Sequence, residues 1–474
     1  SFGRKQEFRD KKRIETSYPM QRSEVSMSDI IQQNYEDINS FEKAAIKRAK
    51  LGMKEDIEQL EEYLFENKPD HMESIRFNER TIATKLGDIT FKRRLYYDHE
   101  ADEYVFLLDE ALKIRERKRA SGEFFKLLVI LASMMTYRQV EEVLKVAGFP
   151  VLSHTTVFNE VRSFGERESK KIKAEKEELY SQGKLKKSEQ KEVPILFVEL
   201  DGVMVSSQEE DSNNFEVKMG LCHEGWKYTS PAKTRKKLIN PKILTGVYDS
   251  AEDFYEEFSY YINTKYNLDK TKIILNGDGA SWIQKTSYDY FDNLIVQLDR
   301  FHIKKDITIH FGKQIAEDLT GVLAGGKKKL FLDTLESLIY DGDNGKIIEG
   351  RETLFKHYKK YEGHLLDYRH RIKVKDNYPE LHGMGAIESY IGKIISRRMK
   401  NQGMSWKRLG AEAMVKILML RHNKILETRL DDKYYKIKNP IKELKYRKRV
   451  FKRNWTDWLQ VSMPVIYGPC SGQN

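Results

Sequence analysis

Apolar residues recur along the first part of the chain with two different spacings. Between residues 38 and 66 they return every three or four positions, the period of a helix that buries one face. Between residues 80 and 109 apolar and polar residues alternate around turn residues, in the runs TIATKLGDITFKRRLYY and YVFLLD. This alternation predicts strands. We therefore expect a polar tail, a long amphipathic helix and then a β-rich segment.

The helical period returns between residues 122 and 165. The run TYRQVEEVLKV ends near Gly148, and Ser153 is placed to cap a second helix, HTTVFNEVRSFG. Two short helices around a glycine-containing turn are typical of a helix-turn-helix, and also of an ordinary helical hairpin. On the first interpretation, the second helix offers five candidate DNA contacts: His154, Thr155, Thr156, Asn159 and Arg162.

The second half of the chain has an α/β pattern. Residues 166–192 are almost purely charged and polar, which indicates a linker or a solvated helix. Beyond them, strand-length apolar runs come first in succession and then alternate with helical runs, which predicts a mixed sheet flanked by helices. The predicted strands are 193–201, 214–222, 243–249, 272–278 and 293–299, and the helices between them are 251–266 and 280–291.

The remaining residues are predicted to be helical, with a basic end. A helical pattern covers residues 312–381 around the turn DGDNG, and two further helices are expected at 383–401 and 405–424. Residues 441–454 contain seven Lys or Arg residues and one Glu. Such a segment fits either a solvated tail or an arm that binds phosphates.

Composition narrows the class of partner. The 474 residues suggest two to four domains, and 84 Lys and Arg against 73 Asp and Glu give a net charge of +11. This balance favours a polyanion such as nucleic acid. The two cysteines, Cys222 and Cys470, exclude a disulfide framework and a multi-cysteine zinc site. No run is long and apolar enough for a membrane span or a signal peptide, so we expect a cytoplasmic protein.

Two aspartates are candidates for metal chemistry. Asp201 ends the run ILFVELD and Asp278 ends IILNGD, and a glycine follows each of them. Ligands in open α/β sheets bind at the carboxyl ends of strands, and carboxylates without cysteine suit Mg²⁺ or Mn²⁺. Because Asp-Gly is also a common turn signal, two ordinary turns are the alternative.

A glutamate further along the chain strengthens the metal interpretation. Glu388 borders a helical stripe of isoleucines at 387, 391, 394 and 395, which would pack on the sheet. Gly385 and Gly392 lie about one turn to either side, which leaves room for close approach. A surface glutamate is the alternative.

These runs, in this order, resemble the DDE-class transposases of bacterial insertion sequences, in the Mutator-like branch and closest to the ISLre family. The resemblance extends from about residue 80 to residue 424. It rests on VELDGVMVSSQ, NGDGASWI, LDRFH and GAIESYIGKIISRRMKNQGMSW.

The resemblance implies a ribonuclease H-like fold and a specific set of site residues. Asp201, Asp278 and Glu388 would be the catalytic ligands of two divalent ions, Mg²⁺ or Mn²⁺. Asp299 and His302 match the family's Asp-x-x-His element, whose His is expected near the active site, whereas a lone His after a strand is otherwise structural. Trp282 matches a Trp that relatives share after the second Asp.

The patterns described above divide the chain into segments, and the resemblance implies that one of them, 312–381, is an insertion. We expect a polar tail and long helix (1–75), a β-rich segment (76–121), the helix-turn-helix-like segment (122–165), a charged linker (166–192), a catalytic domain (193–311 and 382–424) interrupted by a helical insertion (312–381), and a basic tail (425–474).

The implied reaction is metal-dependent cleavage and strand transfer of DNA, in which two ions clamp the attacking and leaving oxygens. The implied partners are the double-stranded DNA of element ends and target, and a second copy of the chain when two ends are joined. Arg397, Arg398 and Lys400 would line the DNA channel or form surface ion pairs.

Two rival functions fit the same residues. One is a nuclease or resolvase that cuts DNA without joining strands, and the other is a DNA-binding regulator without catalysis. A phosphate-loop NTPase and a Rossmann enzyme are disfavoured, because the chain has neither GxxxxGK[ST] nor a GxGxxG run after a strand.

Overall fold

The computed structural model describes residues 35–182, 190–209, 214–284, 287–340, 347–373 and 378–431. The chain divides into two compact units, and residues 81–88 belong to the second unit although residues 89–104 belong to the first. The basic segment 441–454 and the DGDNG turn lie outside the described residues, as do Cys470 and most of the polar tail.

The first unit is built on the predicted long helix. Helix α2 (Ile38–Glu66) has the predicted bounds, and the Asp37 side chain caps it by accepting a hydrogen bond from the backbone N–H of Ser40 (2.8 Å). Strands β1 (Met72–Thr84), β2 (Gly87–Asp98) and β3 (Glu103–Val105) form a sheet in that order, which confirms the alternating pattern. One strand prediction was wrong: Leu107 and Leu108 begin helix α3 (Leu107–Ala111), whose first turn contains Asp109 and Glu110, and acidic residues favour the start of a helix.

Three helices follow in the second unit. They are α4 (Gly122–Ala132), α5 (Tyr137–Val146) and α6 (His154–Gln182). Helix α6 continues through the charged run to Gln182, whereas residues 190–192, the other described part of that run, are not helical. Gly165 of α6 lies so close to Ala413 that a Cβ on it would meet Ala413 atoms at 2.5 Å, so α6 packs tightly on helix α16 (Arg408–His422).

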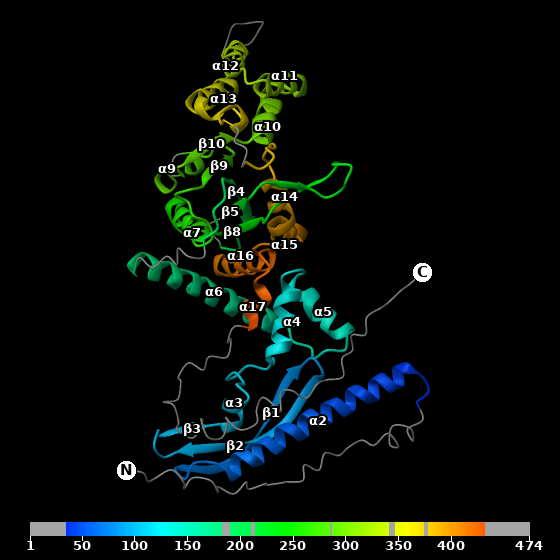
Figure 1. The fold of residues 1–474 in the computed structure, drawn as a ribbon. Coiled ribbons are helices and arrows are strands. Elements are labelled where there is room, and N and C mark those ends of the chain that lie inside the picture. Colours follow the sequence, from blue (N-terminus) through cyan, green and yellow to red (C-terminus); the bar gives the residue numbers. More distant parts are fainter. Residues whose placement is uncertain are drawn as a thin grey trace, which may run out of the picture. The chain divides into compact units, whose positions relative to one another are not determined.

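All five strands predicted beyond residue 193 are present. They are β4 (Ile195–Ser206), β5 (Asn214–His223), β8 (Lys242–Val247), β9 (Lys272–Gly277) and β10 (Leu294–Leu298). They form a mixed sheet in the order β10-β9-β4-β5-β8 (Figure 1). Strand β5 runs antiparallel to both of its neighbours, β4 and β8. Strands β4, β9 and β10 are parallel to one another. The hairpin of β6 (Trp226–Tyr228) and β7 (Lys236–Leu238) was not predicted.

Helices cover both faces of this sheet. On one face, Gly220 lies opposite Leu200 and leaves space for Phe258 of helix α7 (Ala251–Asn263). On the other face, Glu199 contacts the start of helix α14 (Ile387–Ile391). The predicted helix 280–291 appears as α8 (Ser281–Gln284) and α9 (Ser287–Tyr290), on either side of two residues that are not described.

The predicted helical segment has a hydrophobic core of its own. Its helices are α10 (Arg300–Phe311), α11 (Lys313–Ala324), α12 (Lys328–Ser337) and α13 (Glu349–Lys360). Buried side chains such as Ile307, Phe331 and Tyr358 hold them together. The first of these helices begins at residue 300, before the predicted boundary of 312, because Asp299 caps it.

The last segments return to the sheet. Helix α14 continues through a π-helical turn (Gly392–Ser396) into α15 (Arg397–Met399), and α16 is followed by α17 (Leu426–Asp431). The helix predicted from residue 383 begins at Ile387, because Gly385 has a φ of 126° and its N–H is bound outside the helix. Among the described residues, no helix is both long and apolar enough to cross a membrane.

Candidate metal centre

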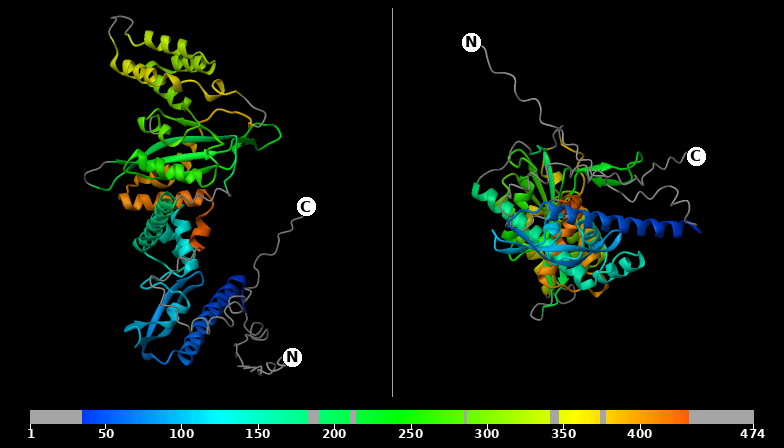
Figure 2. Two further views of the ribbon diagram at one scale, coloured as in Figure 1. Left: turned by 60° about the vertical axis from the view of Figure 1, so that its left-hand side comes forward. Right: turned by 90° about the horizontal axis from the view of Figure 1, so that it is seen from below.

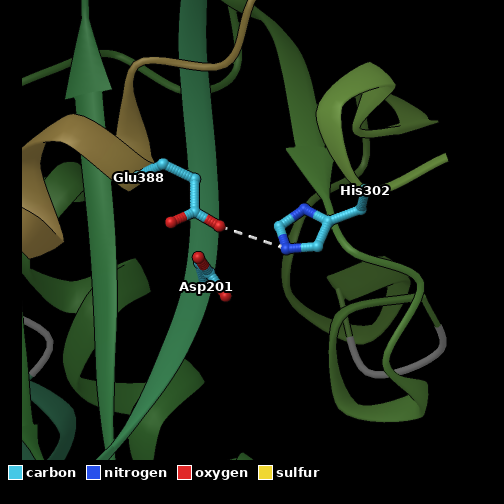
Figure 3. Close-up of side chains that lie close together, drawn as sticks. All are labelled: Asp201, His302 and Glu388. Carbon is cyan, nitrogen blue, oxygen red and sulfur yellow. Dashed lines mark ion pairs between the residues drawn. The ribbon is translucent and has the colours of Figure 1, made fainter. Parts of the chain in front are cut away.

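Three side chains from distant segments meet beside the sheet. Asp201 of β4, His302 of α10 and Glu388 of α14 each offer a ligand atom, and these atoms all lie within 4.8 Å of one another (Figure 3). The His302 Nε2 atom is 3.2 Å from Glu388 Oε1. The structure thus brings together two of the three predicted acidic ligands, with the predicted accessory His as their neighbour.

Asp201 lies inside a strand, not at its end. The prediction that the strand stops at residue 201 was wrong, because the alternating run after Gly202 continues β4 to Ser206. The Asp201 Oδ1 atom accepts a hydrogen bond from the Gly202 N–H (2.7 Å), and the Glu216 side chain lies over Gly202, where a Cβ would meet its Oε1 atom at 2.0 Å. The side chain is thereby fixed toward the cluster.

The electrostatics of Asp201 are those of a crowded acidic site. The residue is only 6% exposed, and burial together with the Glu388 and Asp278 charges raises its pKa to about 7. The Gly202 N–H and His302 oppose this shift. A carboxylate held in this state gains from any cation that binds beside it.

Asp278 directly follows the neighbouring strand β9 and lies outside the three-residue cluster. The parallel register of β4 and β9 pairs Leu200 with Gly277, so Asp278 follows at the level of Asp201. Its Oδ1 atom accepts a hydrogen bond from the Ala280 N–H (2.8 Å). Asp278 therefore follows the carboxyl end of a parallel strand, where ligands bind in open α/β sheets, whereas Asp201 lies inside β4.

His302 is held by the cap of its own helix. Asp299 follows β10 and accepts hydrogen bonds from the N–H groups of Phe301 (2.7 Å) and His302 (3.3 Å). The Asp299 carboxylate, 3.7 Å from His302 Nδ1, raises the pKa of His302, although burial opposes the shift. Asp299 is therefore a positioning residue, and its other oxygen accepts from Asn276 Nδ2 (2.5 Å).

Glu388 depends on a residue that was not predicted. Glu199 Oε2 accepts hydrogen bonds from the N–H groups of Gly385 (3.0 Å) and Ile387 (3.1 Å), which lie immediately before and at the start of α14. Glu199 is fully buried, and its other oxygen is 3.7 Å from His223 Nε2. The sequence did contain a signal for the role of Glu199, because it is a charged residue inside the apolar run VPILFVELD. A buried carboxylate requires partners.

A π-helical segment, Gly392–Ser396, begins four residues after Glu388. Such turns occur mostly as single insertions in α-helices, frequently at functional sites. Here the segment places Ile387, Ile391 and Ile395 in the core while the Glu388 side chain stays 40% exposed. The predicted amphipathic stripe is thus confirmed at three of its four isoleucines.

Trp282 lies in α8 and packs away from the cluster. Its ring is 5.4 Å from that of Phe254, and the Lys218 ammonium lies 4.5 Å from its centroid. Lys218 also pairs with Glu216, the residue that fills the space above Gly202. Trp282 therefore supports the wall beside Asp201.

The candidate DNA contacts on α6 occupy its first turns. Thr155 and Asn159 are exposed, whereas His154 Nδ1 lies 2.9 Å from Glu141 and Arg162 donates to Glu166 (2.7 Å). The Thr156 hydroxyl is 3.0 Å from Ser153, which caps the helix as predicted.

A cavity of about 700 Å³ opens between α5, the start of α6 and the start of α16. Its lining includes Arg138, Thr155, Phe158, Arg162 and Lys407. The helix-turn-helix-like segment thus borders a partly basic hollow.

Arg398 also lines this cavity, although most of its side chain is buried. It donates to the carbonyl of Ala132 (2.7 Å) and lies between the rings of Tyr137 and Trp406. It ties α15 to the helix-turn-helix-like segment. Arg397 and Lys400, in contrast, are exposed.

The donor set suits a divalent cation. Two carboxylate oxygens and one imidazole nitrogen are ligands that Mn²⁺ accepts readily, and Mg²⁺ prefers the oxygens. The partial exposure of Glu388 leaves the cluster open to solvent on one side. An open position is what separates a site for chemistry from a closed structural site.

The chain belongs to a family defined by sequence. A profile of the uncharacterised protein family UPF0236 matches residues 35–432. A relative from Streptococcus gallolyticus, printed as "UPF0236 protein in vanSb 3'region", is 27% identical over 77% of this chain and 77% of its own length. A relative from Caldanaerobacter subterraneus subsp. tengcongensis is 26% identical over 78% of this chain and 72% of its own length. Its printed name, "UPF0236 protein", is followed by eleven TTE designations.

Proposed function

We propose that this member of the UPF0236 family is a DDE-type transposase, which cleaves DNA strands and joins them to a target with the help of divalent metal ions. Asp201, Asp278 and Glu388 would hold Mg²⁺ or Mn²⁺, two ions in each site. The partners would be the double-stranded DNA of element ends and target, and a second copy of the chain.

The observation that carries the proposal is the convergence of Asp201 and Glu388, which come from distant segments and share one cluster. Asp278 directly follows the strand paired with β4, and its charge acts on Asp201. Carboxylates in such proximity repel one another, and the raised pKa of Asp201 reflects that repulsion together with burial. A bound cation would remove this cost.

The topology supports the same function. Three antiparallel strands in chain order, followed by two parallel strands on the other side of the first, are what a ribonuclease H-like core requires. The acidic residues lie on its central strand, at the end of the next strand and on a helix that packs across the sheet. This arrangement agrees with the resemblance to DDE-class transposases.

The printed name of one relative provides independent support. We interpret the eleven designations joined in one name from one strain as several genes for the same protein. A second relative from that strain carries four. A mobile element produces several copies of its own gene in one chromosome. Neither a nuclease or resolvase nor a DNA-binding regulator requires several copies.

The chain's own residues would act in distinct ways. The ions, when bound, would polarise the scissile phosphate and lower the pKa of an attacking water or 3′-hydroxyl. Asp201 is held by the Gly202 N–H, and Glu388 is held through the bonds that Glu199 makes to α14. His302, kept in place by Asp299, presents its Nε2 atom toward Glu388 and can hold a proton there.

The test is a strand-transfer assay with the purified full chain. Duplex DNA from the two borders of the gene would be incubated with Mn²⁺ and a supercoiled plasmid, and the products would be sequenced. We expect border DNA covalently joined to the plasmid. Cleavage without joining would instead identify a nuclease or resolvase.

A matched pair of variants separates chemistry from binding. Asp201→Asn removes a ligand, whereas Asp249→Asn removes a carboxylate that lies on the surface and pairs with Arg408. We expect the first variant to bind DNA and form no product, and the second to act like the wild type. Full activity of a folded Asp201→Asn protein would refute the proposal.

A further inference from the structure

The β6–β7 hairpin is the most one-sidedly charged element among the described residues. Its sequence from residue 226 to residue 238, WKYTSPAKTRKKL, contains no acidic residue. It carries five exposed cations: Lys227, Lys233, Arg235, Lys236 and Lys237. The hairpin follows β5 and extends outward from the sheet. It is drawn in green in Figures 1 and 2.

The pairing of the hairpin concentrates like charges. Its antiparallel register places Lys227 directly opposite Lys237 on one face. Like charges directly opposite each other destabilise a strand pair. Among the described residues, no carboxylate forms an ion pair with any of the five cations. Cations nearby are neutralised, as Lys191 is by Glu224 (2.5 Å). The hairpin thus retains a repulsion that a polyanion would relieve.

The opposite face fixes the hairpin to the core. The Trp226 ring lies 4.6 Å from Phe197 and 4.7 Å from His223. The ammonium groups of Lys233 and Lys236 lie within 6 Å of the Tyr228 ring centroid. The hairpin is therefore held on an aromatic base, with the face of Lys227 and Lys237 free to bind a partner.

The hairpin also contacts the segment that leads to the metal centre. The Tyr228 hydroxyl donates to Glu380 (3.2 Å), and Lys236 Nζ lies 2.7 Å from His382 Nδ1. That segment continues to Gly385, whose N–H is bound by Glu199 next to the start of the Glu388 helix. A partner on the hairpin would therefore lie on a surface that is continuous with the candidate site.

We propose that the β6–β7 hairpin binds double-stranded DNA through its phosphates and holds the duplex beside the metal centre. A two-stranded ribbon fits the major groove, which is about 12 Å wide, and cations at its turn and on its free face can reach the phosphates on either side. This assignment rests on the proposed function, because it names the element that holds the DNA substrate.

The experiment measures DNA affinity of the full chain in EDTA, where cleavage does not occur. Fluorescence anisotropy with a 30-base-pair duplex would be followed from 50 to 300 mM salt. The variant is Lys233→Gln with Arg235→Gln and Lys237→Gln, which spares Lys236 and its contact with His382. We expect about a 10- to 30-fold loss of affinity at 100 mM salt, and a slope of log K against log salt reduced by roughly 2 to 3.

A second triple variant serves as the control. Lys313→Gln, Lys327→Gln and Lys329→Gln remove the same charge from exposed positions at the starts of α11 and α12. We expect less than a twofold change in affinity. An equal loss in both variants, or none in the hairpin variant, would overturn the assignment. So would an equal loss for single-stranded DNA of the same sequence.

The two proposals fail in distinguishable ways. If the wild type joins DNA strands but the hairpin variant binds the duplex normally, only the hairpin assignment is wrong. If the hairpin variant loses affinity but the wild type neither cuts nor joins DNA with Mn²⁺, the transposase assignment is wrong and the hairpin remains a DNA-binding element. Thermal unfolding of each variant confirms that it is folded.

Discussion

Strand β4 carries two carboxylates on one face, and the protein uses them in opposite ways. Glu199 is fully buried, accepts two backbone hydrogen bonds and lies beside the buried His223. Asp201, two residues further, is bonded to the Gly202 N–H and lies beside Glu388 and His302, which are both partly exposed. Each carboxylate has a histidine for a neighbour, so residue type alone does not separate them.

The difference between the two lies in their donors and in their access to solvent. At Glu199, two N–H groups occupy one oxygen, so the charge serves to fix the start of α14. At Asp201, a second carboxylate lies close by and the cluster is open to solvent on one side, so a cation can approach. A buried acid that accepts hydrogen bonds from backbone N–H groups positions structure, and one that faces another acid is prepared to bind a cation.

Glu388→Gln gives the largest expected effect. We predict a loss of strand cleavage of about 10³-fold, because a neutral amide is a poor ligand for a hard cation. The thermal midpoint without metal should be unchanged or higher, since a repulsion is removed. Cleavage rates in Mn²⁺ and an unfolding curve in EDTA measure the two quantities. Wild-type rates in this variant would place the chemistry elsewhere.

Glu199→Ala tests whether Glu199 fixes the start of α14. The N–H groups of Gly385 and Ile387 would lose their acceptor inside the protein, and we predict a loss of about 3 kcal/mol in the free energy of unfolding. Glu199→Gln is the control, because its carbonyl can still accept, and it should cost less than half as much. Urea unfolding compares them. Equal losses would mean that the charge, and not the acceptor, fixes α14.

Asp201→Asn should stabilise the metal-free protein at high pH. The pKa of Asp201 is raised from 3.8 to about 7 in the folded chain, so ionisation opposes folding. The wild type therefore loses stability relative to the variant as the pH rises from about 4 to about 7. We predict an advantage of about 2 kcal/mol for the variant at pH 8, and none at pH 4. Urea unfolding in EDTA at both pH values measures it, and an advantage that does not vary with pH would contradict it.

The smallest expected effect is on the affinity for Mn²⁺ when His302 or His223 is replaced. We predict that His302→Ala weakens Mn²⁺ binding about tenfold, as the loss of a neighbour or ligand of a metal site does. His223→Ala should leave the affinity for Mn²⁺ unchanged, although it destabilises the core. Isothermal titration of both variants with Mn²⁺ makes the comparison. A similar loss of affinity in both would show that the two carboxylates of β4 are coupled.

The sequence predicted the elements far better than their ends and contacts. The five strands of the mixed sheet and the bounds of α2 follow from periodic burial, which each segment encodes locally. The end of β4 was placed too early, because Asp-Gly is a strong turn signal and the neighbouring strand that continues the pairing is not visible in the sequence. The burial of Arg398 was not visible either, because it depends in part on Tyr137, which is distant along the chain.

The sequence by itself determined which residue types were available at the ends of apolar runs, and so named Asp201, Asp278 and Glu388 as candidates. Only the tertiary structure decided that Asp201 and Glu388 share a cluster with His302, that Glu199 fixes the start of the helix that carries Glu388, and that the hairpin presents five exposed cations. Strand and helix periods are local properties of the chain. Contacts between segments depend on register and packing, which only the folded chain specifies.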